Sequence, residues 1–119
     1  ADKRGIVQEN PQRKTLTVID AIIAGEKEGP LEPCPKPIGT LVAGENPVAV
    51  DLTCSQIMGF DCHKIPTLKR ASGFKSIKPI QITDGIQILA DETVKLEDVF
   101  SRYGHRFSPT SGWKGRIEC

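Results

Sequence analysis

The sequence predicts an α/β domain with a small mixed sheet of about four strands and two or three helices. Short β-branched apolar runs, bounded by glycines or carboxylates, alternate with segments that carry helix start and stop signals. A length of 119 residues also favours a single domain. We expect the sheet to be parallel where helices cross over it and antiparallel at one tight turn.

The first strand follows a polar lead-in. Residues 1–14 contain glycine, proline and two basic pairs, so we expect a flexible segment before a single domain at 15–119. Residues 15–20 are β-branched and apolar and end in a carboxylate, which is typical of a strand. The apolar run continues through 21–24, where the sequence indicates a turn of helix.

Prolines dominate the next segment, residues 25–39. Gly29 and Pro30 form a turn signal, and prolines at 33, 35 and 37 disfavour both a helix and a sheet interior. The sequence therefore predicts a stiff, extended loop. This loop is either a rigid connector or part of a ligand site at the carboxyl end of the sheet, where open α/β folds bind their ligands.

A strand and a well-delimited helix come next. Residues 39–44 form a short apolar run with a glycine at each end. Asn46 is a suitable N-cap, Pro47 suits the first helical position, and Gly59 is a typical left-handed terminator. These signals predict a helix that ends near Met58.

The second half of the chain contains shorter elements. We expect a helix at 66–71, strands at 77–82 and 86–90 joined by a tight turn at Asp84 and Gly85, and a helix at 96–103. Four of the six aromatic residues lie in the last 20 positions, and none lies in the first 59. We therefore expect the tail from Phe100 to Trp113 to fold back over a thin aliphatic sheet. An apolar face would then stay exposed or form a homo-oligomer.

Composition restricts the possible classes of function. A formal net charge of +1 provides no overall field for nucleic acid or anionic lipid, and no apolar stretch is long enough to cross a membrane. Without a visible secretory leader, we expect a cytoplasmic protein with free thiols. No cofactor is assigned, because there is no glycine-rich phosphate motif and the cysteines at 34, 54, 62 and 119 form no C-x-x-C pair.

Two aspartates are candidate site residues. Asp20 ends the first strand, and Asp51 lies near the start of a helix that follows a strand. Both are expected near the carboxyl ends of strands, where they could hold a cation or act as acid and base. In the alternative interpretation, Asp20 caps a turn and Asp51 satisfies backbone donors.

A basic block follows an acidic region. Residues 62–83 contain five basic side chains and no acid, whereas residues 20–61 contain seven acids against two lysines. Such neighbouring charges are typical of solvated or mutually facing surfaces. Alternatively, the block binds a phosphate-bearing or acidic partner through Lys64, Lys69, Arg70, Lys75 and Lys78.

Several motifs resemble a known family. The most specific are GENPVAVD at 44–51, IMGFD at 57–61 and KIP at 64–66. With the stretches at 18–22, 28–30, 107–109 and 112–115, they resemble the C-terminal part of an uncharacterised bacterial and archaeal family, domain of unknown function 362. The resemblance covers about residues 15–119. It implies a longer protein, so the upstream part of the same protein is the expected partner.

The resemblance implies candidate ligand-binding residues but no established activity: Asp20, Gly29, Pro30 and Asp51. Three functions follow as hypotheses. In the first, the domain contributes these acids and the proline loop to a ligand or metal site that upstream sequence completes. In the second, it is an iron–sulfur-associated redox protein, since some relatives carry ferredoxin-type cysteine runs, although this chain lacks one. In the third, it is a binding module that uses residues 64–78.

Overall fold

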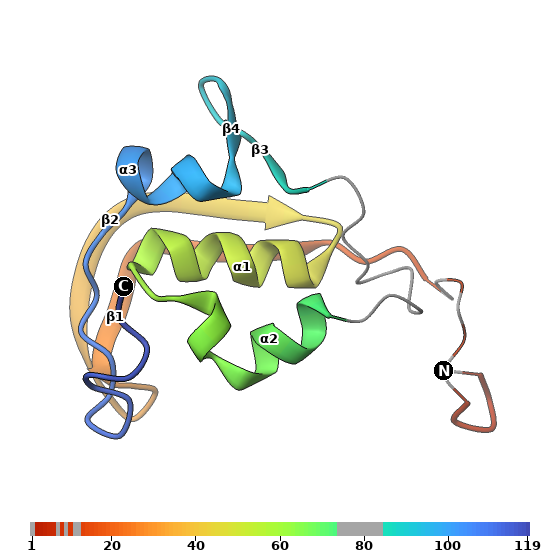
Figure 1. Cartoon of the computed structure of the whole chain (residues 1–119), viewed down its shortest axis with the longest axis horizontal. Helices are drawn as coiled ribbons and strands as arrows, with labels where there is room; N and C mark the ends of the chain where they lie inside the picture. The colour runs from red at the N-terminus through yellow and green to blue at the C-terminus, as the bar shows by residue number, and fades with distance from the viewer. Residues whose placement is uncertain (1, 7, 9, 11–12, 74–84) are drawn as a thin grey trace.

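A central helix organises the chain in the computed structural model, which describes residues 2–6, 8, 10, 13–73 and 85–119 (Figure 1). No helix in these described ranges is long and apolar enough to span a membrane. The elements, in chain order, are β1 (Thr17–Glu28), β2 (Glu32–Gly44), α1 (Pro47–Met58), the 3₁₀ turn η1 (Cys62–Lys64), α2 (Pro66–Ser72), β3 (Gln87–Leu89), β4 (Thr93–Lys95), the 3₁₀ turn η3 (Leu96–Asp98) and α3 (Val99–Tyr103).

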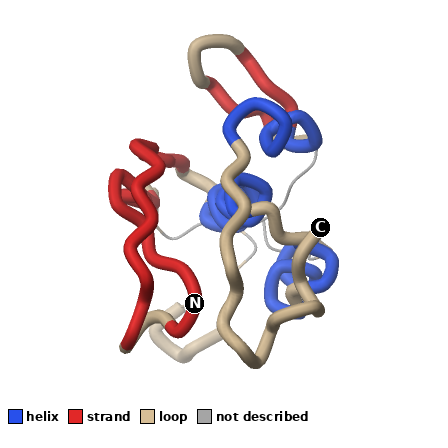
Figure 2. The backbone as a smooth tube through the Cα atoms, turned by 90° about the vertical axis from the view of Figure 1, so that its left-hand side faces the viewer, coloured by secondary structure: helices blue, strands red, loops and turns tan. Residues whose placement is uncertain are grey.

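The layers are arranged around α1. Figure 2 shows the long β1–β2 hairpin on one side of this helix and α2 on the other. The expected α/β class is confirmed, with four strands and three α-helices among the described residues. These strands form two separate antiparallel pairs, β1–β2 and β3–β4, instead of the single mixed sheet that we expected. The strand predicted at 77–82 and the turn residue Asp84 lie outside the described residues.

The β1–β2 hairpin corrects two predictions. Residues 21–24 continue β1 and form no helical turn, and most of the predicted 25–39 loop belongs to β1 and β2. The prolines at 33, 35 and 37 are compatible with a strand because they are two residues apart, so all three nitrogens face away from β1. In a two-stranded sheet each strand is an edge, and a proline there breaks no ladder hydrogen bond.

The predicted signals of α1 are confirmed in detail. The Asn46 side-chain oxygen accepts hydrogen bonds from the backbone N–H groups of Val48 and Ala49, at 3.0 and 3.2 Å. Pro47 opens the helix, and Gly59 ends it in the left-handed conformation at φ 76°. Three buried clusters surround the helix, and α1 contributes to or contacts each of them: Val48, Leu52 and Cys62; Ile57, Val94 and Val99; Phe60, Phe107 and Ile117.

The tail, residues 104–119, is tied to the end of α1. Its backbone N–H groups at His105 and Phe107 donate to the carbonyl oxygens of Ile57 and Met58, at 2.6 and 3.0 Å. These carbonyls belong to the last turn of the helix, which lacks intrahelical donors. The buried cluster that contains Phe107 packs against Ala24 and Ile38 of the hairpin, and Lys36 Nζ lies 5.0 Å from the centre of the Phe107 ring, so the prediction that the tail folds back over the sheet is confirmed at this residue.

An ion pair and two hydrogen bonds join the tail to the end of the hairpin that is nearer its turn. Lys36 Nζ lies 3.1 Å from Glu26 Oε2 and donates to the carbonyl oxygen of Arg106 at 2.7 Å. The backbone N–H of Ser108 donates to the same Glu26 oxygen at 2.9 Å. The Ser108 N–H and the Lys36 ammonium both favour the ionised carboxyl, so the pKa of Glu26 is lowered.

The other face of the hairpin is apolar and exposed. Its exposed side chains are 52–69% accessible: Leu16, Val18, Ile22, Ile23 and Leu41. Burial alternates along both strands, and half-buried Ile38 and Val42 pack against the cluster that contains Ile57 of α1. The exposed apolar face expected from the sequence is therefore present on the hairpin.

Candidate functional site

A pocket of about 430 Å³ lies between α1, α2 and the tail. One face of α1 forms its first wall through Asp51, Cys54, Ser55 and Met58. These residues follow the i, i+3, i+4, i+7 spacing, which places side chains on the same side of a helix. The pocket is therefore on the side of α1 that carries α2, opposite the hairpin (Figure 2).

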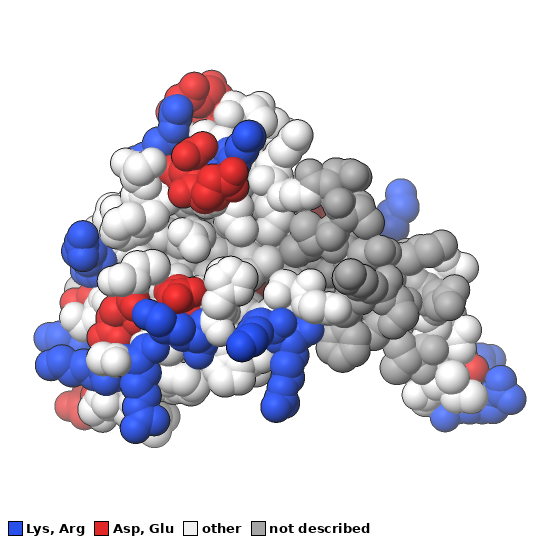
Figure 3. All heavy atoms as spheres, in the orientation of Figure 1, with Lys and Arg blue, Asp and Glu red and all other residues white. Residues whose placement is uncertain are grey.

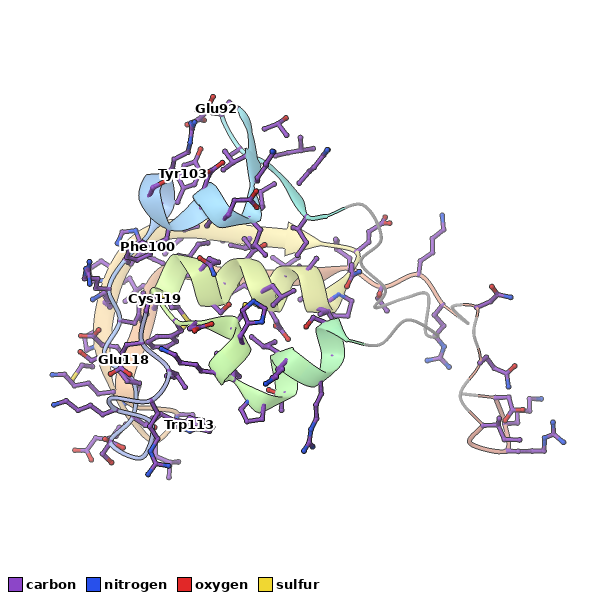
Figure 4. The ribbon with its side chains drawn as sticks, in the orientation of Figure 1. Glu92, Phe100, Tyr103, Trp113, Glu118 and Cys119 are labelled. Carbon is purple, nitrogen blue, oxygen red and sulfur yellow. The ribbon has the colours of Figure 1, made fainter. Side chains whose placement is uncertain are left out.

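The remaining walls are apolar and come from three places in the chain. They are Phe60 after α1, Ile65 and Leu68 at α2, and Trp113 and Ile117 in the tail. The tail is held there because Asp61 donates its backbone N–H to the carbonyl oxygen of Ile117 at 2.7 Å. Trp113, the only tryptophan of the chain, is 43% exposed at the rim (Figure 4).

Among the described residues that line this pocket, Asp51 is the only charged one. Within the described part of the chain, its carboxylate makes no hydrogen bond or ion pair. The Ser55 hydroxyl is already used, because it donates to the carbonyl oxygen of Leu52 at 2.8 Å. Burial, and secondarily the charge of Asp51, raise the pKa of Cys54, so this thiol is neutral at physiological pH. The pocket thus combines apolar walls with one available carboxylate.

Asp20, the second predicted aspartate, lies elsewhere. It is exposed on β1, and its Oδ1 accepts a hydrogen bond from the backbone N–H of Ile22 at 3.0 Å. Asp20 is therefore engaged with the backbone inside β1, whereas the alternative interpretation placed it as the cap of a turn. Asp20 and Asp51 are not brought together: Asp20 is exposed on the hairpin, whereas Asp51 lines a pocket with residues of α2 and the tail.

The predicted loop residues Gly29 and Pro30 form the turn between β1 and β2, with a cis peptide bond between them. The N–H of Gly29 donates to the carbonyl oxygen of Lys27 at 2.9 Å. Neighbouring Glu28 accepts a hydrogen bond from the backbone N–H of Ser111 at 2.8 Å. This end of the hairpin therefore contacts the tail and contributes no lining residue to the pocket at Asp51.

The basic block forms a second hollow, of about 730 Å³, beside α2. Its lining includes His63, Lys64, Lys69 and Arg70. Figure 3 shows basic side chains gathered along this lower part of the molecule. Lys64 is partly neutralised, since its Nζ donates to the Glu118 carbonyl oxygen at 2.8 Å and lies 3.7 Å from Asp61. The other two predicted members, Lys75 and Lys78, lie outside the described residues.

The four cysteines are distributed over four parts of the fold. Cys34, Cys54, Cys62 and Cys119 are all free thiols and come from β2, α1, η1 and the tail. Across residues 13–73 and 85–119 and the described lead-in positions, no three histidine, cysteine or acidic side chains gather as a metal site.

Most of the pocket was not identified from the sequence. Sequence reasoning selected Asp51 but not Leu68, Trp113 or Ile117, which lie far from it along the chain. The available signal was the spacing of 51, 54, 55 and 58, which marks one helix face. Nothing in the local sequence shows that the tail crosses this face.

The fold and pocket define a small α/β domain built on one capped helix and its flanking hairpin. Residues 4–56 match a family model described as Domain of unknown function (DUF362). The resemblance inferred from the motifs is thereby confirmed, with Asp20, Gly29, Pro30 and Asp51 inside the matched range. The match begins within the expected lead-in and ends in α1, so it is shifted towards the N-terminus from the expected 15–119. No match was found among curated proteins or among solved structures.

Proposed function

We propose that this chain is a ligand-binding domain whose site is the pocket between α1, α2 and the tail. One observation carries the proposal: a single helix face supplies an unpaired carboxylate, Asp51, to a pocket whose other walls are apolar. The volume of about 430 Å³ falls within the range of about 300–1,000 Å³ that is usual for small-molecule sites. The first hypothesis from the sequence is thereby modified. The site contains Asp51 and is completed by α2 and the tail, while Asp20 and the hairpin turn have structural roles.

The test uses two reporters that the pocket already contains. Binding of 2-phenylethanol, a neutral aromatic probe, is expected to change the fluorescence of Trp113. It should also slow the alkylation of Cys54 by iodoacetamide, while exposed Cys119 reacts at an unchanged rate. Mass spectrometry of tryptic peptides separates the two thiols.

A matched pair of variants places the binding in this pocket. Cys54→Phe fills the cavity and should weaken binding at least about tenfold, whereas Cys54→Ser keeps the volume and should change it less than about threefold. Circular dichroism confirms that both variants are folded. Equal binding by both variants would refute the proposal, as would a wild type that binds neither this alcohol nor its ammonium counterpart, 2-phenylethylamine.

The basic hollow supports a second candidate function, the binding of a phosphate-bearing or acidic partner. Its specific support is that His63, Lys64, Lys69 and Arg70 line one depression. Salt-sensitive binding of inorganic pyrophosphate, measured by calorimetry, should be lost in the double variant Lys69→Glu, Arg70→Glu. A charge-matched control, Arg13→Glu with Lys95→Glu, should bind as the wild type does. Absence of salt-sensitive binding would exclude this function.

A further inference from the structure

We infer that the pocket at Asp51 selects a positively charged ligand with an apolar body, an aryl- or alkylammonium ion. This inference rests on the proposed function and names its ligand class. The described lining of the pocket contains one charged side chain, the carboxylate of Asp51. A neutral or anionic ligand of the same shape would use the apolar walls but not the carboxylate.

The carboxylate of Asp51 is available for such a ligand. In the described ranges no lysine, arginine or backbone donor occupies it. An ammonium group at its oxygens would form a charge-assisted hydrogen bond, which is stronger than a bond between neutral groups. Because Asp51 is exposed, water screens this interaction, and the expected gain is modest.

The rim adds a second group that favours a cation. Trp113 lines the same pocket, and an indole is the aromatic side chain that attracts cations most strongly through its ring. Cys54 contributes no competing anion, because its thiol stays protonated. Met58 and Phe60 provide polarisable and aromatic surface for the apolar body of the ligand.

The nearby basic side chains lie outside the pocket lining. Lys64 is engaged with Glu118 and Asp61, and Lys69 lines the separate basic hollow. Neither lysine lines the pocket at Asp51. Within the described part of the chain, the basic side chains therefore leave the carboxylate free for an external cation.

Three probes that share a phenyl ring and differ in charge test the inference. They are 2-phenylethylamine, which is an ammonium ion at neutral pH, the neutral 2-phenylethanol, and the anion 3-phenylpropanoate. Affinities are measured by saturation-transfer NMR on the full chain at low ionic strength. We expect the ammonium to bind about fivefold more tightly than the alcohol, and the carboxylate to bind most weakly.

Substitutions show whether Asp51 causes the preference. Asp51→Asn keeps the shape of the side chain and should make the ammonium and the alcohol bind about equally. Asp20→Asn, the same change on the other side of α1, should leave the preference intact. Trp113→Leu should reduce the preference for the ammonium by about two- to threefold.

The possible outcomes separate this inference from the proposed function. The inferred charge selection is wrong if the alcohol binds as tightly as the ammonium, or if the ammonium is still preferred in Asp51→Asn. In either case the proposed binding site is retained. Tightest binding of the carboxylate would equally overturn the charge selection. If none of the three probes binds, both the selection and the proposed function are refuted.

Discussion

Glu26 is the residue that links three parts of the molecule. Its carboxylate accepts a hydrogen bond from the tail at Ser108 and pairs with Lys36 of β2. Its pKa is lowered chiefly by the Ser108 N–H and then by Lys36. Its contribution to stability is therefore present above the ordinary carboxyl pKa of 4.5 and is lost as the pH falls through the lowered pKa.

Glu26→Gln tests this pH dependence. At pH 7 the variant should unfold at a lower urea concentration than the wild type, because it lacks the charge that holds Lys36. The difference should shrink as the pH falls through the lowered pKa of Glu26, because the protonated wild-type carboxyl resembles the amide. Glu32→Gln, at an exposed carboxyl of β2, should match the wild type throughout. A difference between Glu26→Gln and the wild type that is independent of pH would contradict the assignment.

At the scale of residues, the sequence identified Asp51 because its position relative to a strand and a helix is a local property. It did not distinguish Asp51 from Asp20, since both are acids near the end of a predicted strand. The distinction depends on the backbone N–H of Ile22, which donates a hydrogen bond to Asp20, and on the tail, which brings Trp113 to the pocket that Asp51 lines. Both features depend on the backbone path, which residue type and spacing do not determine.

At the scale of elements, Gly59 is where α1 meets the tail. Its φ of 76° favours glycine, and a Cβ there would come within 2.9 Å of Phe100 Cε2. We expect Gly59→Ala to lower the free energy of unfolding by about 1–3 kcal/mol, through backbone strain and this contact. Chemical denaturation measures the change.

The matched control is Gly112→Ala. A Cβ at Gly112 meets no heavy atom within 4 Å, and its φ is not positive. Its effect should stay within about 0.5 kcal/mol. If both variants lost the same stability, the conformation of Gly59 would not explain the effect.

An element could be predicted from the sequence when the residues that determine it lie close to it along the chain. The ends of α1 were predicted because Asn46, Pro47 and Gly59 act within a few residues of themselves. The hairpin was missed because its prolines are unfavourable in a sheet interior and harmless at an edge. Whether a strand becomes an edge depends on how many strands join it, and that is a property of the whole fold.

At the scale of the whole molecule, the hairpin packs on α1 through one face only. Its other face exposes Val18, Ile23 and Leu41 by more than half. Exposed apolar surface of this kind is typical of contact sites. We keep two proposals for what covers it: the upstream part of the same protein and a second copy of this chain.

Analytical ultracentrifugation of the isolated chain tests whether a second copy of the chain covers this face. The average mass should rise with protein concentration, and the double variant Val18→Lys, Leu41→Lys should remain monomeric. Leu31→Lys, at a 96% exposed leucine in the hairpin turn, should behave as the wild type. A wild type that stays monomeric at every concentration would remove the second copy as a partner.

The prolines of β2 also determine which amide protons the hairpin can exchange with solvent. Between residues 33 and 37 only Cys34 and Lys36 carry a backbone N–H, and the alternation of the strand directs both towards β1. An ordinary two-stranded ribbon has outward amides that exchange rapidly even when it is intact. This half of β2 has none, so deuterium uptake at Cys34 and Lys36 directly measures how often the two strands separate.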